Sequence, residues 1–255
     1  MRFLPETTAD GVSEHLFVLD GITGVLWSPA GADGDRPLIL LAHGGGRHKK
    51  APGLLARARH HVTTGGFAVA AIDAPGHGDR PRTADDEAAA VRIREAVASG
   101  VPVAPLVASH NAALAARSVP EWRATLDALQ AHGRVGHDVP VGFWGMSMGG
   151  AVGIPLAAAE PRITAAVFGL VGNEEPLADA AARITVPVRF LLQWDDELVP
   201  RSSSLALFGA FASRDKTLHA NPGRHAELPT YEMESEHRFF AGRLARVPGA
   251  TRAQH

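Results

Sequence analysis

A chain of 255 residues is long enough for one large domain with a substantial core, and 45% hydrophobic and 20% charged residues are ordinary for a soluble globular protein. The formal net charge of −2 gives no reason to expect nucleic acid, whose binding needs concentrated basic surface. The absence of cysteine excludes disulfides, cysteine nucleophiles and cysteine-based zinc sites.

The sequence predicts neither a secretory leader nor a membrane helix. Residues 1–20 lack a basic start followed by an apolar run, and no apolar stretch approaches the roughly 20 residues that span a bilayer. We therefore expect a cytoplasmic protein without a membrane span. Nothing in the sequence predicts its oligomeric state.

Apolar strand patterns alternate with helical patterns along most of the chain. An opening antiparallel hairpin is expected at 15–20 and 22–27, with Asp20-Gly21 as its turn. Further strands are expected at 38–42, 67–72, 139–144, 163–170, 186–193 and 216–221, and helices at 55–62, at 121–130, from 147, at 202–212 and from about 230. This alternation predicts an α/β fold in a single domain over 1–255, with a mostly parallel sheet covered by helices on both faces.

Residues 78–119 are more than a plain crossover between strands requires. Thr83 with Asp86 predicts the start of a helix, and a Pro-interrupted apolar run at 101–106 follows it. The segment is either a set of surface helices or a lid or pocket wall. In the second interpretation, Val103 and Leu106 would face the active site.

Two further local patterns concern helices. Ser118, three residues before Glu121, predicts a capping box at the start of helix 121–130. Pro155 is expected to kink or shorten the helix that begins at 147, because proline removes a backbone donor.

The run Gly145-Met146-Ser147-Met148-Gly149 is the most informative part of the sequence. It lies between a predicted strand and a predicted helix, which is the context that the Gly-x-Ser-x-Gly pattern needs. The two glycines let the backbone turn sharply without a Cβ clash, so the serine can stand clear of the sheet edge. We therefore predict that Ser147 is a nucleophile.

A serine hydroxyl needs a base, and the base needs an acid that orients it. Two loops after later predicted strands supply them: Asp195 and Asp196 follow one strand, and His225 follows the next. Both loops are expected at the carboxyl ends of parallel strands, where open α/β sheets place their sites. Other histidines fall within strand or helix patterns and are expected to lie on the surface or in packing contacts: His60, His61, His219 and His237.

Taken together, four segments resemble the α/β-hydrolase superfamily over essentially the whole chain, and most closely its small esterases and dienelactone-hydrolase-like members. They occur in the order expected for that fold: His43-Gly44-Gly45-Gly46, Asp73-Ala74-Pro75-Gly76-His77-Gly78, the run around Ser147, and Asp196-Glu197-Leu198-Val199-Pro200 followed by Gly223-Arg224-His225.

The resemblance implies that Asp196, which opens an Asp-x-x-Val-Pro stretch, is the acid, and that Asp195 is a loop residue. The family usually has glycine three residues before this aspartate, where the present chain has Gln193. Dienelactone hydrolases carry cysteine at the nucleophile position. Ser147 therefore favours an esterase and makes a lactone a weaker inference.

An oxyanion hole needs two preorganised donors. We expect the backbone N–H of Met148 to be one, and that of Gly45, or next Gly46, to be the other. His43 is expected to shape the glycine loop through hydrogen bonds. Since neither a phosphate-binding loop pattern nor a metal-ligand spacing is present, no cofactor or metal is expected.

The predicted function is hydrolysis of a small or medium carboxylic ester through an acyl-enzyme, by Ser147, His225 and Asp196. The same residues could instead act on a thioester, lactone or amide, or transfer the acyl group. A non-catalytic binding protein with this fold is a third alternative. The basic run Arg47-His48-Lys49-Lys50 predicts a solvated face, or else a surface that attracts anionic substrates.

Overall fold

The computed structural model describes residues 1–31, 35–133 and 135–244. The strands are β1 Arg2–Phe3, β2 Thr7–Ala9, β3 Val12–Leu19, β4 Ile22–Pro29, β5 Leu38–Ala42, β6 Ala68–Ile72, β7 Val141–Met146, β8 Ile163–Gly169, β9 Val188–Gln193 and β10 Lys216–Asn221. The helices are α1 Pro52–Gly65, α2 Ala84–Ala98, α3 Ala104–Ala131, α4 Met148–Ala159, α5 Glu175–Ala181, α6 Arg201–Ala210 and α7 Tyr231–Leu244.

These strands form one sheet in the order β1-β3-β4-β6-β5-β7-β8-β9-β10, with β2 paired to β3. Neighbours from β6 to β10 run parallel, whereas the pairs that involve β1 to β4 are antiparallel. The β3–β4 hairpin turns at Asp20 and Gly21, whose φ values of 47° and 80° suit a two-residue turn. The predicted fold class is therefore confirmed.

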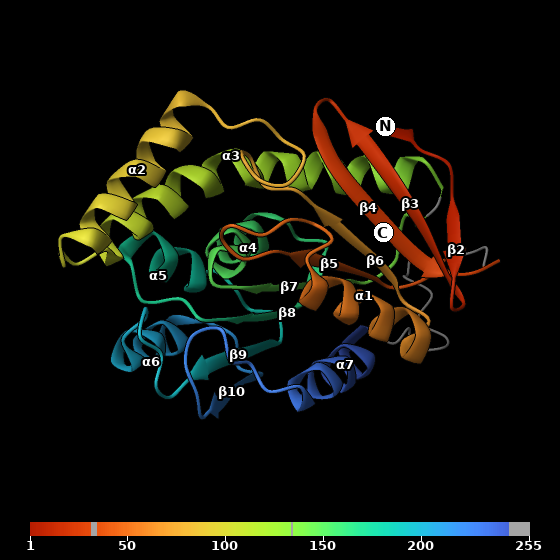
Figure 1. Cartoon of the computed structure of the whole chain (residues 1–255). Helices are drawn as coiled ribbons and strands as arrows, with labels where there is room; N and C mark the ends of the chain where they lie inside the picture. Colours follow the sequence, from red (N-terminus) through yellow and green to blue (C-terminus); the bar gives the residue numbers. More distant parts are fainter. Residues whose placement is uncertain (32–34, 134, 245–255) are drawn as a thin grey trace.

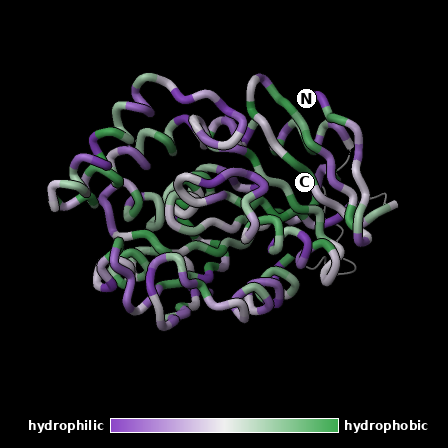
Figure 2. Tube along the Cα trace, viewed as in Figure 1, coloured by the Kyte–Doolittle hydropathy of each residue, from purple (hydrophilic) through white to green (hydrophobic). Residues whose placement is uncertain are grey.

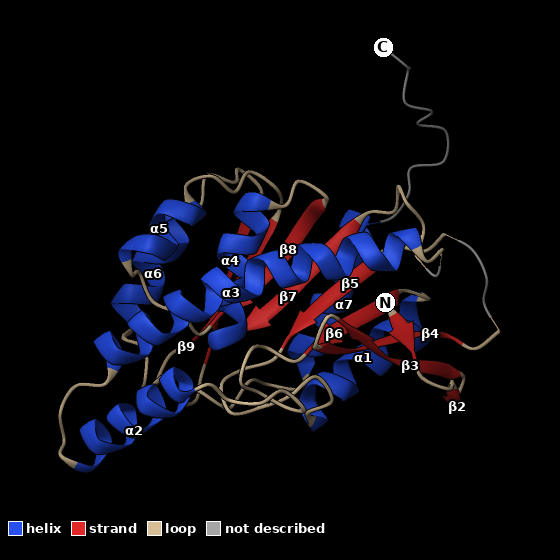
Figure 3. Ribbon diagram, turned by 90° about the horizontal axis from the view of Figure 1, so that it is seen from above, coloured by secondary structure: helices blue, strands red, loops and turns tan. Residues whose placement is uncertain are grey.

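Helices cover both faces of the sheet (Figures 1 and 3). Helices α1 and α7 pack on one face, and α3, α4, α5 and α6 pack on the other. Successive side chains of a strand point to opposite faces, so Leu38 and Leu40 enter one core cluster while Ile39 and Leu41 enter the other. Strands covered in this way are apolar throughout, and hydrophobic residues follow the central strands in Figure 2.

The helix predicted at 121–130 is wrong at its start, because α3 begins at Ala104. Ser118 is buried inside α3 and caps nothing, and the helix runs through Pro120. Proline usually marks a helix boundary. Here α3 packs along α4 and lies across the parallel strands, and this packing outweighs the lost backbone hydrogen bond (Figure 3).

Other local predictions have mixed outcomes. The cap at Thr83 is confirmed, since Thr83 Oγ1 accepts the Asp86 N–H at 3.2 Å and Asp86 Oδ2 accepts the Thr83 N–H at 3.0 Å. Helix α4 is not shortened by Pro155 and continues to Ala159. The short elements β1, β2 and α5 were not predicted.

Candidate active site

Ser147 stands on the turn between β7 and α4, at the carboxyl edge of the sheet. Its φ of 56° and ψ of −124° are uncommon for a residue with a side chain. The turn is held because Ser147 N–H donates to the Gly169 carbonyl at 2.9 Å. A Cβ at Gly149 would lie 2.5 Å from the Ala42 carbonyl oxygen, and one at Gly145 would overlap the Gly149 carbonyl. Close backbone packing therefore requires both glycines.

The structure brings the three residues of the predicted triad together. Ser147 Oγ lies 2.9 Å from His225 Nε2, and His225 Nδ1 lies 2.8 Å from Asp196 Oδ2. With a neutral imidazole, Nδ1–H donates to the carboxylate and Nε2 accepts from the serine hydroxyl. This is the geometry of an activated nucleophile.

Asp196 is held by the backbone as well as by the histidine. Its Oδ1 accepts the N–H groups of Leu198 at 2.8 Å and Val199 at 2.9 Å. Burial alone would raise the pKa of Asp196, but the hydrogen bond from His225 and those from the backbone hold this pKa below its ordinary value. Asp195 is exposed, and its backbone N–H donates to the Gly223 carbonyl. The geometry thus distinguishes the two aspartates.

Two residues that the sequence did not mark as functional hold the loop that carries His225. Gln193 is 1% exposed, and its Nε2 lies 3.3, 3.3 and 2.8 Å from the carbonyl oxygens of Pro222, Arg224 and Glu227. Glu197 accepts the backbone N–H of His225 at 3.0 Å. The unusual glutamine three residues before Asp196 was the available signal for the first of these contacts.

The glycine loop after β5 lies beside the start of α4. A Cβ at Gly45 would be 4.0 Å from Cβ and Sδ of Met148, so the two expected oxyanion donors belong to adjacent segments. His43 Nδ1 lies 2.9 Å from the Gly44 carbonyl oxygen, and His43 Nε2 accepts the Ala74 N–H at 3.1 Å. Burial lowers the pKa of His43 to about 4, so a neutral imidazole shapes this loop.

The basic run after this loop is only in part the solvated face that was predicted, because Arg47 and His48 are exposed whereas Lys49 is not. Lys49 is buried, and its Nζ pairs with Asp73 at 2.5 Å and with Asp79 at 2.6 Å. Burial alone would lower the pKa of Lys49, but these two carboxylates raise it above its ordinary value. Lys50 pairs with Glu14 at 2.5 Å. Both lysine charges are therefore matched within the protein.

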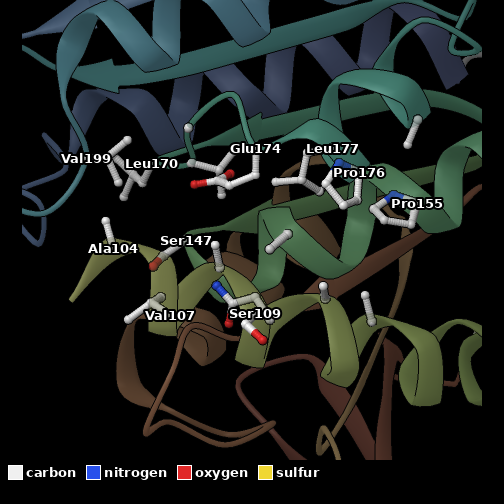
Figure 4. A pocket seen from close by; sticks show the side chains of 18 of the residues that line it. Ala104, Val107, Ser109, Ser147, Pro155, Leu170, Glu174, Pro176, Leu177 and Val199 are labelled. Atoms are coloured by element: carbon white, nitrogen blue, oxygen red, sulfur yellow. The ribbon is translucent and has the colours of Figure 1, made fainter. Parts of the chain in front are cut away.

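A cavity of about 690 Å³ opens beside Ser147 and His225 (Figure 4). One face of α3 lines it from Ala104 to Pro120, which corresponds to about 24 Å of helix. Across from α3, the lining comes from α4, from α5 and from the loops that follow β8 and β9. Most of these residues are apolar, and the polar ones are Ser109, Asn111, Ser147, Glu174, Arg183 and His225.

Val103 lines this cavity as expected, whereas the expectation for Leu106 is wrong. Leu106 lies instead in a second cavity of about 530 Å³ between α2 and α3. Leu106 lies inside α3, whereas Val103 directly precedes its first residue. Because the sequence did not show that α3 begins at Ala104, it did not show which way either side chain would face.

Neither a metal cluster nor a spanning helix is found in the described part of the chain. Within residues 1–31, 35–133 and 135–244, no group of three or more His, Asp or Glu side chains could hold a metal ion. No helix formed by these residues is long and apolar enough to cross a membrane.

Comparison with known proteins gives structural relatives that are esterases. A cold-adapted esterase from an Arctic intertidal metagenomic library is 37% identical, with a TM-score of 0.76, covering 96% of this chain and all of that one. An acetyl xylan esterase from a Paenibacillus species (18% identity, TM-score 0.68, 95% and 88% covered) and an esterase from Pyrococcus furiosus (13%, 0.65, 96% and 93%) share the fold. No family model and no curated protein sequence matches the chain.

The sheet order and the position of the Ser147 turn are those of an α/β-hydrolase. This chain and the Arctic intertidal esterase are 37% identical over nearly their full length, which is enough to place both in one family. The chain belongs to the α/β-hydrolase family of esterases that includes the Arctic intertidal enzyme.

Proposed function

We propose that the protein is a serine hydrolase that cleaves a small or medium carboxylic ester through an acyl-enzyme. The observation that carries the proposal is the pair of contacts from Ser147 Oγ to His225 Nε2 at 2.9 Å and from His225 Nδ1 to Asp196 at 2.8 Å, at a cavity of substrate size. Membership of an esterase family supports it.

In this mechanism Ser147 Oγ attacks the ester carbonyl carbon while His225 Nε2 takes the hydroxyl proton. His225 then gives the proton to the departing alcohol oxygen. Water attacks the acyl-enzyme with His225 again as base, which releases the carboxylic acid and restores the serine. Asp196 fixes the imidazole tautomer and stabilises the imidazolium, and the N–H groups of Gly45 and Met148 stabilise the oxyanion.

We also infer that the later part of the segment 78–119, from Val103 onward, serves as a pocket wall. Helix α3 supplies one side of the cavity, and most of its lining residues are small or apolar, among them Ala104, Val107, Ala108, Ala112, Ala115, Ala116 and Val119. Such a wall would bury the acyl or alcohol group and exclude water from the reaction. The cytoplasmic location and the single-domain organisation stay predictions from the sequence.

The test is to assay p-nitrophenyl esters, thioesters and lactones with the wild type and with Ser147→Ala. We expect ester hydrolysis by the wild type and a loss on the order of 10⁴–10⁶ in kcat for the variant. A fluorophosphonate should label the wild type at Ser147 and leave the variant unlabelled. Labelling elsewhere, or activity retained in Ser147→Ala, would refute the nucleophile assignment.

A further inference from the structure

The cavity beside Ser147 contains a carboxylate that the proposed mechanism does not use. Glu174 follows β8 and directly precedes α5, and its side chain is half-buried. Figure 4 shows its carboxylate pointing into the cavity between Leu170 and Leu177, across from the part of α3 that carries Val107. A carboxylate in this position would lie against whatever group fills that part of the cavity.

The backbone segment that carries Glu174 is fixed by hydrogen bonds on both sides. Gly169, five residues earlier, accepts the backbone N–H of Ser147, and Asn173 N–H donates to Ser203 Oγ at 2.7 Å. A Cβ at Gly172 would lie 3.2 Å from Glu174 Oε1 and 2.6 Å from Ser203 Oγ. Glycine at this position therefore leaves room for the carboxylate to fold back over the segment.

Glu174 has no partner of opposite charge within the described residues, where its side chain makes neither a hydrogen bond nor an ion pair. Arg183 is the other charged side chain among the described residues that line the cavity. It lies beyond the far end of α5, about 14 Å along the helix axis at 1.5 Å per residue, and is exposed to solvent. Its guanidinium donates to the Asp179 carbonyl at 2.9 Å.

The surroundings of Glu174 favour a cationic ligand. Its neighbours in the lining include Leu170, Val171 and Leu177, which are buried and apolar. A charge pair beside such groups is screened less than one in open water. An anionic group placed there would meet an uncompensated negative charge, and an uncharged apolar group would cover a carboxylate without pairing it.

We propose that Glu174 selects esters that carry a positively charged amine, by pairing with the ammonium group while Ser147 attacks the ester carbonyl. This inference rests on the proposed ester hydrolysis. It assigns Glu174 a role in specificity. The chemical step still depends on Ser147, His225 and the oxyanion donors.

The test compares two p-nitrophenyl esters of equal length at pH 8. The acyl chain of one ends in a trimethylammonium group, and that of the other ends in a tert-butyl group of the same shape. We expect Glu174→Gln to lower the ratio of kcat/KM for the charged ester to kcat/KM for the neutral ester by about tenfold, equivalent to about 1.4 kcal/mol. High salt should lower the wild-type ratio in the same direction.

Glu175→Gln is the matched control, because Glu175 is the next residue, is exposed and does not line the cavity. It changes the net charge equally, so its ratio should stay at the wild-type value. A third ester whose acyl chain ends in a carboxylate should be a poor substrate of the wild type and a better one of Glu174→Gln.

The outcomes separate this inference from the proposed function. If the wild type and both variants hydrolyse the neutral ester and the ratio is unchanged in Glu174→Gln, the specificity role is overturned while ester hydrolysis stands. An equal fall of the ratio in Glu175→Gln would also overturn it, since the effect would then come from net charge. If the wild type hydrolyses no ester, the proposed function itself fails.

Discussion

At the residue scale, two side chains that face the cavity share an unusual backbone conformation. Ser147 and Leu170 both have positive φ, at 56° and 58°, and they follow the neighbouring strands β7 and β8. The two residues are linked through Gly169, which precedes Leu170 and accepts the Ser147 N–H. Strain of this kind persists only where the surrounding structure holds it. Close backbone packing around Gly145 and Gly149 holds the turn that carries Ser147.

The neighbouring aspartates give a direct test of the proposed acid. Asp196→Asn should lower kcat on the order of 10⁴-fold, because the amide favours the wrong imidazole tautomer. Asp195→Asn should cost little, since that side chain is exposed and His225 pairs with Asp196. Steady-state kinetics on one ester measures both, and a larger loss in Asp195→Asn would reverse the assignment.

Gln193 is expected to position His225 without touching substrate. Gln193→Ala removes the donor that contacts three carbonyl oxygens of the His225 loop, so kcat should fall roughly 10- to 100-fold with KM little changed. Gln193→Glu should be worse, because a carboxylate would face those same carbonyl oxygens. Kinetics and the rate of fluorophosphonate labelling measure the effect. Equal, wild-type-like rates in both variants would show that the loop holds its own position.

At the element scale, α3 separates two cavities along its length. The cavity beside Ser147 lies along one face, and the second cavity, shared with α2, lies along another. Small side chains on the first face leave the cavity open for about 24 Å of helix. The size of these side chains should therefore set which acyl or alcohol groups fit.

Adjacent residues of α3 allow this wall to be tested with a matched pair. Ala112 lines the cavity beside Ser147, whereas Ala113 lines the second cavity. Ala112→Leu should raise KM for the longer p-nitrophenyl esters and leave the acetate nearly unchanged, because the added side chain occupies cavity space. Ala113→Leu adds the same volume and should keep the wild-type length profile. Identical profiles for the two variants would argue against α3 as the wall.

At the scale of the whole molecule, buried histidines couple stability to pH. His61 in α1 and His237 in α7 meet with their Nδ1 atoms 3.3 Å apart, between the helices that cover one face of the sheet. Burial, together with the nearby histidines and Arg57, lowers the pKa of His61 well below 6.5. Burial also lowers the pKa of His237.

The sign of this effect follows from proton uptake. Because the pKa values of these two histidines are lower in the folded protein than in the unfolded chain, unfolding takes up protons as the pH falls through the ordinary histidine pKa of 6.5, and the free energy of unfolding should fall with it. His43, with its pKa lowered to about 4, acts in the same direction between pH 6.5 and 4. Glu236 acts oppositely, because burial raises its pKa and favours the protonated form in the folded state.

The prediction concerns the slope of stability against pH. His61→Leu should make the fall in the free energy of unfolding between pH 7 and 5 shallower, because leucine takes up no proton on unfolding. Urea unfolding across this range measures the slope. His137→Leu is the control for the loss of one imidazole, since His137 is exposed to solvent. A wild-type slope in His61→Leu would show that His61 does not contribute to the pH dependence of the free energy of unfolding.

The sequence alone determined the fold class and the residues of the candidate site. Continuous apolar strands, helices between them and the Asp20-Gly21 turn are local signals that predict the sheet. Ser147, the Asp195-Asp196 pair and His225 each follow a strand in the expected order. Such signals work because periodicity and turn chemistry act over a few residues, whatever the rest of the chain does.

Helix continuity, burial and side-chain partners depend on contacts between distant segments, and these features followed only from the tertiary structure. It made α3 one helix through Pro120, because packing against α4 and the sheet outweighs a missing backbone donor. It buried Lys49 between carboxylates that follow another strand, and it turned Gln193 toward the His225 loop. Glu174 likewise became a cavity carboxylate only through the fold. Burial and partners come from the whole chain, so no local pattern could have specified them.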